Sequence, residues 1–328
     1  MKRALHVAVL MGGKSAEHEV SLRSATNVIA GIRRLGHRVT AITVPKSGRI
    51  SSAHLHVLFG RSVDVVFPLI HGPFGEDGTV QGMLKLADKP YVGPDVLGSA
   101  VGMDKETAKR LMADAGIPVA PFVVLRKGER HPSFTALISR LGSPVFIKPS
   151  ALGSSVGVHK VSGAKELRRA LNDAFLYDHK VLAEACIAGR ELECSVLGNE
   201  RLEASVPGEV VPRHDFYSYA AKYVDPDGAA LVIPARLTAS QRRRVCETAI
   251  AACRALSCEG MARVDFFLTP AGKLYVNEVN TIPGFTDISM YPKLWAASGL
   301  PYDTLIRRLL ELAVARHRRD ANLKTSYV

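Results

Sequence analysis

The sequence lacks long apolar runs and clusters of metal-ligating residues. No stretch approaches about 18 consecutive apolar residues, so we expect no membrane span and no membrane partner. The five cysteines form no C-x-x-C pair and have no histidines near them, which argues against structural zinc and against a disulfide framework. Reduced thiols fit a cytoplasmic protein best. The apolar run that starts the chain ends at Gly12-Gly13 without a cleavage-like site, and it predicts a first strand rather than a signal peptide.

The sequence also lacks a segment in which basic and aromatic residues are interleaved. Its net charge of +12 raises the question of nucleic acid, because basic proteins gain affinity for polyanions through counterion release. The basic residues are scattered, however, apart from residues 242–244 and 316–319, which lie in expected helices and favour a solvated face. We therefore expect no nucleic-acid partner. A nucleic-acid-binding protein with a vestigial nucleotide site is kept as a competing hypothesis.

The N-terminal part of the chain predicts a small parallel α/β domain, because short apolar strands alternate with helical segments through about residue 95. Loops at residues 12–19 and 71–78 follow expected strands, and in such folds small molecules usually bind there. The dinucleotide fingerprint G-x-G-x-x-G is absent. His71 opens the second loop, and taken alone it leaves open a ligand site or a structural strand cap. The expected strands of this domain are 7–11, 38–44 and 63–70.

A second domain is expected to begin near Asp104, which is suited to cap a helix that ends at Ala115-Gly116. Further on, an apolar strand ends in Lys148 and is followed by a segment rich in glycine and serine, residues 150–157. This is not a Walker A loop, in which the lysine follows the glycines. It predicts a flap that folds N–H groups and hydroxyls over phosphates, beside a fixed positive charge. A flexible linker is the alternative, but linkers do not usually interrupt a pair of apolar strands, the second expected at residues 156–158.

Residues 205–227 predict a long ordered loop, since they mix prolines with three tyrosines. Loops of that length in compact domains commonly act as lids. Strands are expected before it, at 180–184 and 191–196, and helices after it, at 238–258 and 302–319.

Two late runs rich in β-branched and aromatic residues, 263–268 and 274–280, predict a β-hairpin. With a four-residue loop, two cross-strand pairs place four polar side chains on one sheet face, whereas a loop of three or five would separate them. Acids so close repel each other unless a positive charge lies between them, and Mg²⁺ is the natural candidate. A solvated strand face is the alternative. The expected pairs are Arg263 with Asn280 and Asp265 with Glu278.

A turn at residues 281–286 leaves the hairpin directly and offers free backbone N–H groups to an anion or an oxyanion. With this turn, the chain resembles the ATP-grasp superfamily and, within it, the D-alanine–D-alanine ligase family. The resemblance runs from Gly12 to about Trp295 and is carried by five motifs. They are GGKSAEHEVS at 12–21, HGPFGEDG at 71–78, KPSALGSSVG at 148–157, YAAKY at 219–223 and NEVNTIPGFT at 277–286.

The family resemblance implies an ATP-grasp fold of the α/β (α+β) class in three domains, with a parallel α/β domain first. The expected domains are a substrate-binding domain at 1–103, a central subdomain with the phosphate flap at 104–190, and a C-terminal subdomain with lid and metal site at 191–328. Lys105 and Lys148 are expected to contact the ATP phosphates. The flap expected to cover these phosphates is formed by Gly153, Ser154 and Ser155. Those expected to hold adenine and ribose are Glu184 and Glu191. The positions matching two Mg²⁺ ions, for which Mn²⁺ can substitute, are Asp265, Glu278 and Asn280.

The resemblance further implies ligation of two D-alanines through D-alanyl phosphate, for peptidoglycan precursor synthesis in the cytoplasm. The residues expected around the first D-alanine are Glu17 and His71, with Ser154 and Tyr223 hydrogen-bonded to Glu17. Those expected to stabilise the oxyanion are Arg263 and the N–H of Gly284. Those expected to bind the carboxylate of the second D-alanine are Lys222, Ser289 and the N–H of Met290. Tyr223 points to D-alanine rather than D-lactate as acceptor.

Several alternatives stay open within the superfamily. D-lactate or D-serine could be the acceptor, or another ATP-grasp ligase could join a different carboxylate and amine. The family also suggests a homodimer.

Overall fold

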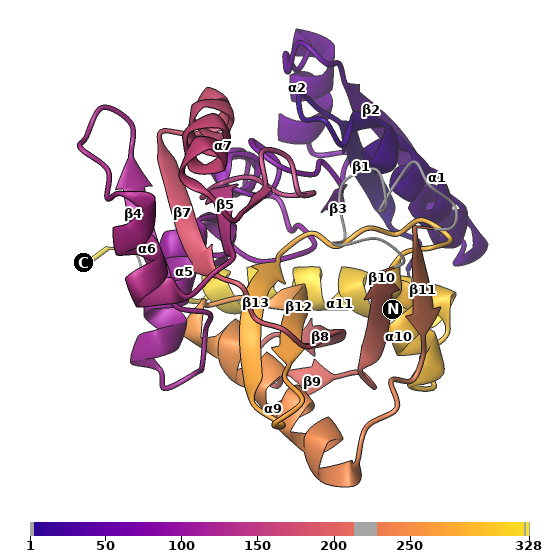
Figure 1. Cartoon of the computed structure of the whole chain (residues 1–328). Coiled ribbons are helices and arrows are strands. Elements are labelled where there is room, and N and C mark those ends of the chain that lie inside the picture. Colours follow the sequence, from indigo (N-terminus) through magenta and orange to yellow (C-terminus); the bar gives the residue numbers. More distant parts are fainter. Residues whose placement is uncertain (1–2, 213–227, 325, 328) are drawn as a thin grey trace.

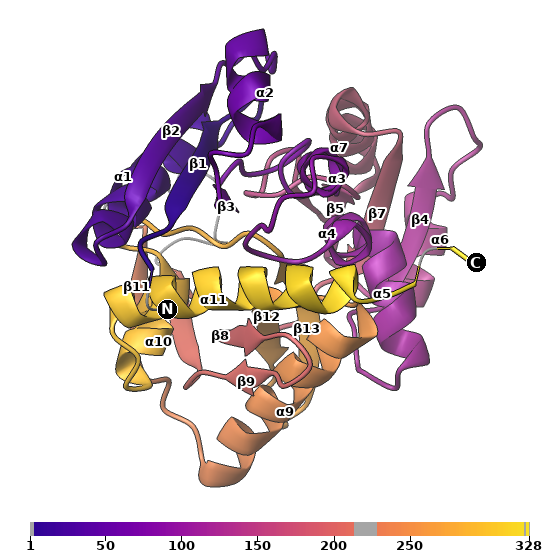
Figure 2. The same ribbon diagram turned by 180° about the vertical axis from the view of Figure 1, so that it is seen from behind.

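The computed structural model describes residues 3–212, 228–324, 326 and 327. These residues build three β-sheets, each from its own stretch of chain, with helices packed around and between them (Figures 1 and 2). In the described part of the chain no helix is long and apolar enough to cross a membrane. The predicted domain boundaries remain a proposal.

The N-terminal sheet is parallel, as predicted, with β1 between β2 and β3. Alternation along β1 fixes its place: Val7 and Val9 pack with α1, whereas Ala8 and Leu10 pack on the other face with α2 and α3. Both faces of the strand are therefore buried. The elements are β1 (His6–Gly12), α1 (His18–Arg34), β2 (Arg38–Val44), α2 (Ser52–Phe59), β3 (Val65–Pro68) and α3 (Thr79–Leu86).

The central sheet is antiparallel, in the order β4-β7-β5-β6. Helices α6 and α7 cover one face through apolar residues such as Leu137 and Leu171. Asp104 caps α5 as predicted, since its Oδ1 accepts a hydrogen bond of 2.8 Å from Thr107 N. The elements are α4 (Val96–Met103), α5 (Lys105–Asp114), β4 (Phe122–Arg126), α6 (Phe134–Leu141), β5 (Val145–Pro149), β6 (His159–Val161), α7 (Ala164–Tyr177) and β7 (Lys180–Ala185).

The C-terminal sheet is also antiparallel, in the order β11-β10-β8-β12-β13, with β9 paired to β8. Helix α9 covers one face and leaves the other to the candidate site. The elements are β8 (Arg190–Gly198), β9 (Glu203–Ala204), β10 (Gly208–Pro212), β11 (Ala229–Val232), α9 (Ala239–Ala255), β12 (Gly260–Leu268), β13 (Leu274–Asn280), α10 (Met290–Ala297) and α11 (Tyr302–Ala321).

Two expectations about irregular segments are wrong. The segment 205–227, predicted to be a loop, contains β10, because the β-branched pair Val210-Val211 suits a strand and its flanking prolines end the strand rather than prevent it. The strand expected at 156–158 starts later, at β6, and those residues belong to the flap. Residues 213–227 of the predicted lid, among them Lys222 and Tyr223, lie outside the described residues.

One apolar core joins the two ends of the chain. Val7, Val28 and Phe67 of the N-terminal domain pack in one cluster with Leu305 and Leu309 of α11. Figure 2 shows α11 running beneath β1 and β3. The N-terminal sheet is thus covered on one face by both α1 and the last helix.

The basic run at the end of α11 is not the solvated face that we expected. Arg316 is buried, donates to the carbonyl oxygens of Tyr91, at 2.9 Å, and of Gly93, and lies over the Tyr91 ring. Arg319 binds Glu259 with contacts of 2.8 and 2.9 Å. Arg316 therefore links α11 to the loop before α4, and Arg319 links it to the residue that precedes β12.

Candidate active site

The hairpin of β12 and β13 forms the floor of the site. Arg263 pairs with Asn280 and Asp265 with Glu278, as predicted. The loop between the strands has five residues rather than four, 269–273, and a β-bulge between these pairs and the turn restores the register. All four polar side chains therefore remain on one face, opposite the apolar residues that pack on α9.

Arg263 is held between two carboxylates. Its Nε and Nη2 donate to both oxygens of Asp265, at 2.7 and 2.8 Å, and Nε lies 2.8 Å from Glu193 Oε2. Burial alone would lower the pKa of Arg263, but these carboxylates and Glu278 raise it well above the usual value. The guanidinium is therefore a fixed positive charge in the wall of the cavity.

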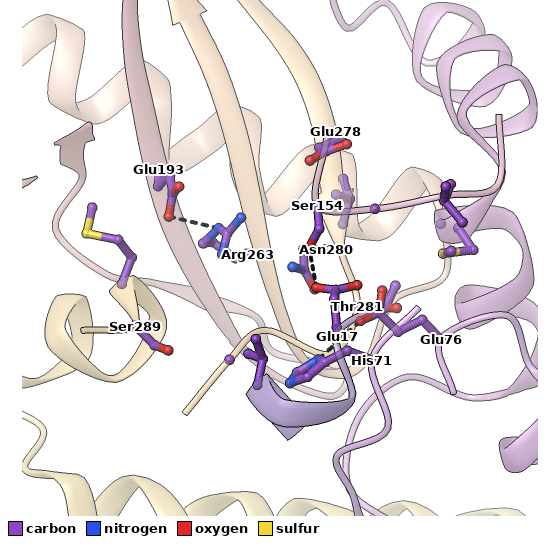
Figure 3. A pocket seen from close by; sticks show the side chains of 18 of the residues that line it. Glu17, His71, Glu76, Ser154, Glu193, Arg263, Glu278, Asn280, Thr281 and Ser289 are labelled. Carbon is purple, nitrogen blue, oxygen red and sulfur yellow. Dashed lines mark hydrogen bonds and ion pairs between the residues drawn. The ribbon is translucent and has the colours of Figure 1, made fainter. Parts of the chain in front are cut away.

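The flap follows β5 and reaches the N-terminal domain. Ser154 and Ser155 have φ angles of 54° and 59°, the left-handed region that non-glycine residues seldom occupy. This backbone turns the Ser154 hydroxyl towards Glu17, to which it donates a hydrogen bond (Figure 3). The predicted contact between the flap and Glu17 is therefore present, whereas its third member, Tyr223, lies outside the described residues.

A chain of charges lies under the flap. Lys105 Nζ donates to the Leu152 carbonyl at 2.6 Å and lies 3.4 Å from Glu278 Oε2. Lys148 Nζ lies 2.6 Å from Glu184 Oε2 and 3.4 Å from Asn277 Oδ1. Both predicted phosphate lysines are thus fixed by contacts at the edge of the cavity.

Glu184 lies deeper than its expected role suggests. Besides Lys148 it contacts Lys109, whose Nζ is 3.3 Å from Oε1, with side-chain exposures of 1% for Lys109 and 2% for Glu184. Burial would raise the pKa of Glu184, but the two lysine charges outweigh it and lower the pKa. Burial lowers the pKa of Lys109. Both directions hold together, because two cations act on Glu184, whereas for Lys109 burial and the charge of Lys148 outweigh the attraction of Glu184 and Glu278.

His71 lies in the cavity with an acidic neighbour. Its Nδ1 is 3.3 Å from Glu76 Oε1, and both residues are buried. Burial favours the neutral imidazole, but the hydrogen bond with Glu76 and the charge of Glu17 outweigh it and raise the pKa of His71. Burial, together with the Glu17 charge, also raises the pKa of Glu76. Both residues line the cavity, and this position favours a role for His71 in a ligand site over a structural role as a strand cap.

The turn after β13 forms the far wall of the cavity. Ser289 stands at the N-terminal boundary of α10, but its Oγ binds the preceding turn, where it accepts a hydrogen bond of 2.9 Å from Thr286 N. A side chain at Gly284 would bring a Cβ atom within 2.8 Å of Ser289 Oγ. This close approach explains why glycine suits position 284.

Two cavities meet at the flap. Residues shared by both are Lys105, Leu152, Gly153, Ser154 and Glu278. Predicted site residues that line only the first are Glu17, His71, Arg263, Asn280, Gly284, Ser289 and Met290. Those that line only the second are Lys148, Ser155, Glu184 and Glu191. Asp265 lies beside the first cavity, bound to Arg263.

The donor set proposed for magnesium fits a hard divalent cation in its chemistry. Two carboxylates and an amide oxygen come from neighbouring cross-strand pairs, and oxygen donors of this kind are what Mg²⁺ prefers. In the structure Arg263 and Lys105 provide the positive charge beside these acids. Among the described residues, no group of three or more histidine, cysteine, aspartate or glutamate side chains is placed to hold a metal ion. The metal site therefore remains a prediction.

Three residues of the site were not predicted from the sequence. Glu193 lies in a strand that was expected, at 191–196, but its contact with Arg263 depends on the pairing of β8 with β12, which was not predicted from the sequence. Glu76 lies within a motif that was recognised, but nothing in the motif assigned it a contact. Lys109 carries no local signal, because its partner comes from the central sheet.

Two family models match the chain. The D-ala D-ala ligase N-terminus matches residues 6–58 and 57–94, and the D-ala D-ala ligase C-terminus matches residues 111–311. The D-alanine–D-alanine ligase of Shouchella clausii (strain KSM-K16) is 47% identical over an alignment that covers 98% of this chain and 97% of the relative. D-alanine–D-alanine ligase A of Escherichia coli (strain K12) is 45% identical, with 98% and 99% covered.

Two solved structures share the fold of this chain. The D-alanine-D-alanine ligase from Coxiella burnetii matches with a TM-score of 0.87 at 37% identity, covering 97% of this chain and 96% of its own. The VanG D-Ala:D-Ser ligase from Enterococcus faecalis matches with a TM-score of 0.83 at 35% identity, covering 95% and 100%.

Proposed function

The chain belongs to the D-alanine–D-alanine ligase family, and we propose that it joins two D-alanines to D-alanyl-D-alanine at the expense of ATP. The observation that carries this proposal is the meeting of two cavities at the flap, Lys105 and Glu278. One cavity, lined by Lys148 and Glu191, suits a nucleotide. The other, lined by Glu17 and Arg263, suits an amino acid whose carboxylate must reach the terminal phosphate.

In the first step, a carboxylate oxygen of the first D-alanine attacks the γ-phosphorus of ATP. The bond from that phosphorus to the leaving ADP oxygen breaks, which gives D-alanyl phosphate and ADP. Lys105 and Lys148 would neutralise phosphate charge, and Glu17 would hold the substrate ammonium. Asp265, Glu278 and Asn280 would hold Mg²⁺, which when bound offsets the charge on the transferred phosphoryl group.

In the second step, the amine of the second D-alanine attacks the carbonyl carbon of D-alanyl phosphate. The carbon–oxygen bond to phosphate then breaks, inorganic phosphate leaves, and the amine gives up a proton. Arg263 and the N–H of Gly284 would stabilise the oxyanion of the tetrahedral intermediate. Ser289 and the N–H of Met290 would hold the acceptor carboxylate, together with Lys222, which lies outside the described residues.

The flap would keep water away from the acyl phosphate. Its contact with Glu17 ties it to the N-terminal domain, so closure over ATP and binding of the first D-alanine would occur together. We further propose a cytoplasmic homodimer that supplies D-alanyl-D-alanine for peptidoglycan precursors.

The test is the release of ADP by the purified protein with Mg-ATP and D-alanine, compared with L-alanine and with D-alanine plus D-lactate or D-serine. Products are identified by mass spectrometry. We expect D-alanyl-D-alanine as the main product and no ADP release by the Glu278→Gln variant. A depsipeptide or D-alanyl-D-serine as the main product would overturn the acceptor assignment, and the absence of ADP with every pair would overturn the proposed activity.

A further inference from the structure

Glu193 lies in the wall of the amino-acid cavity and has no role in the mechanism above. It comes from β8, the strand beside the catalytic hairpin, and lies directly opposite Asp265 in the antiparallel pairing of β8 with β12. Figure 3 shows its carboxylate directed at Arg263, on the same side of the cavity as Ser289. Its side chain is 10% exposed, so this contact is largely shielded from water.

Arg263 is therefore held from two strands. Asp265, two residues on in the same strand, binds Nε and Nη2 and so fixes the plane of the guanidinium. Glu193 approaches the same Nε from the neighbouring strand, at 2.8 Å. This contact is an ion pair, because the single Nε proton is donated to Asp265, and its attraction limits how far the guanidinium can move across the sheet. An arginine side chain has several rotatable bonds, so a single carboxylate on its own strand still allows the guanidinium to move sideways across the sheet. The carboxylate of Glu193, on the neighbouring strand, removes this freedom.

The position of Arg263 matters more than its charge alone. A group that stabilises an oxyanion acts through pre-organisation, because it must already lie where negative charge develops in the transition state. A displacement of about 1 Å in such a group can reduce a rate roughly 100-fold. A carboxylate that fixes Arg263 would therefore govern the step in which the oxyanion forms.

We propose that Glu193 is a positioning residue for the ligation step: it holds Arg263 in place for the tetrahedral intermediate and takes no part in the formation of D-alanyl phosphate. This inference rests on the proposed ligase function. The first step depends on Lys105, Lys148, the flap and the proposed magnesium ligands, whereas Glu193 contacts Arg263, the group proposed to act in the second step. Removing the charge at position 193 thus separates the two steps.

The experiment compares Glu193→Gln with the wild type, using Mg-ATP and D-alanine. Three products are measured: ADP, D-alanyl-D-alanine, and the hydroxamate formed when hydroxylamine traps D-alanyl phosphate. Glu209→Gln is the matched control, because Glu209 also pairs with an arginine of the same sheet, Arg190 at 2.6 Å, but lies outside both cavities. Circular dichroism verifies that each variant is folded.

We expect Glu193→Gln to form the hydroxamate within about twofold of wild type and to form dipeptide roughly 10- to 100-fold more slowly, through kcat rather than through KM for the acceptor. Glu209→Gln should match the wild type in all three products. Glu193→Asp keeps the charge but draws it back from Arg263, and it should show an intermediate loss of dipeptide. This variant carries the test if Glu193→Gln does not fold.

Three results would overturn the proposal. A wild-type ratio of dipeptide to hydroxamate in Glu193→Gln would show that Arg263 needs no second carboxylate. An equal loss of both products would place Glu193 in the first step. A rise in KM for the acceptor with kcat unchanged would make Glu193 a binding group for the second D-alanine. By contrast, the absence of hydroxamate and ADP with the wild type would refute the proposed ligase function itself.

Discussion

Lys109 allows a direct test of how much the buried charges beneath the nucleotide cavity stabilise the fold. The change Lys109→Met keeps most of the side-chain length and removes the charge, which leaves Glu184 with Lys148 as its remaining lysine partner, at 2.6 Å. Removing one partner of a buried ion pair costs about 3–5 kcal/mol, because the other charge stays buried. Since Lys148 remains, we expect the free energy of unfolding to fall by about 3 kcal/mol, the lower end of that range.

The assay is urea unfolding followed by circular dichroism at pH 7. Lys85→Met is the matched control, because Lys85 also forms a close ion pair, 2.6 Å from Asp95, but with 57% of its side chain exposed. We expect that change to cost less than about 1 kcal/mol, since water already screens the pair. If Lys109→Met cost no more than Lys85→Met, the reasoning about the buried cluster would be refuted.

The same cluster predicts a dependence on pH. The two lysines lower the pKa of Glu184 below its usual 4.5, so the ionised carboxylate stabilises the folded state above pH 4.5, and this contribution is lost as the pH falls through the lowered pKa. Without Lys109 the pKa of Glu184 rises. Acid unfolding of Lys109→Met should therefore begin at a higher pH than that of the wild type, and an unchanged midpoint would contradict the assignment.

Three further changes test other parts of the structure. Gly284→Ala should slow dipeptide formation by up to roughly 100-fold, because the new Cβ lies 2.8 Å from Ser289 Oγ and forces this hydroxyl away from Thr286 N, in the turn that carries the oxyanion N–H. The control Gly82→Ala, in α3, where an added Cβ meets no atom within 4 Å, should keep full activity and gain about 1 kcal/mol of stability. Arg316→Met should cost about 3 kcal/mol in urea unfolding, since two buried carbonyls lose a charged donor; a cost below about 1 kcal/mol would contradict this role. Glu76→Gln should bring the pKa of His71 below 6.5, measured by NMR titration, because burial is then opposed by fewer charges; an unchanged pKa would show that Glu76 does not set it.

The catalytic hairpin shows what alternation along a strand can and cannot predict. Alternating polar and apolar residues predicted both cross-strand pairs correctly. The expectation that a loop of five residues would separate the four side chains was wrong, because a bulge beyond the turn restores the register. A sign of this was present in the sequence: Val276 and Val279 are both apolar, and residues three apart share a strand face only when a bulge lies between them. In the structure both are buried.

The partners of charged residues were harder to predict than the strands that bear them. Glu193 reaches Arg263 only because β8 and β12 are neighbours, and strand order depends on the packing of the whole domain. Lys109 and Arg316 lie on helices in patterns that resemble solvated faces. Their burial depends on carboxylate and carbonyl groups contributed by distant parts of the chain.

The packing of α11 on the N-terminal sheet has a consequence for how the protein is made. A ribosome releases β1 and β3 early, yet one face of that sheet receives part of its apolar cover only when residues 302–321 emerge. Domains generally fold in the order of their synthesis, but here the apolar core of the first domain is completed only by the last helix. A nascent chain stalled before α11 would expose Val7, Phe67 and their neighbours, and would become a target for chaperones and proteases.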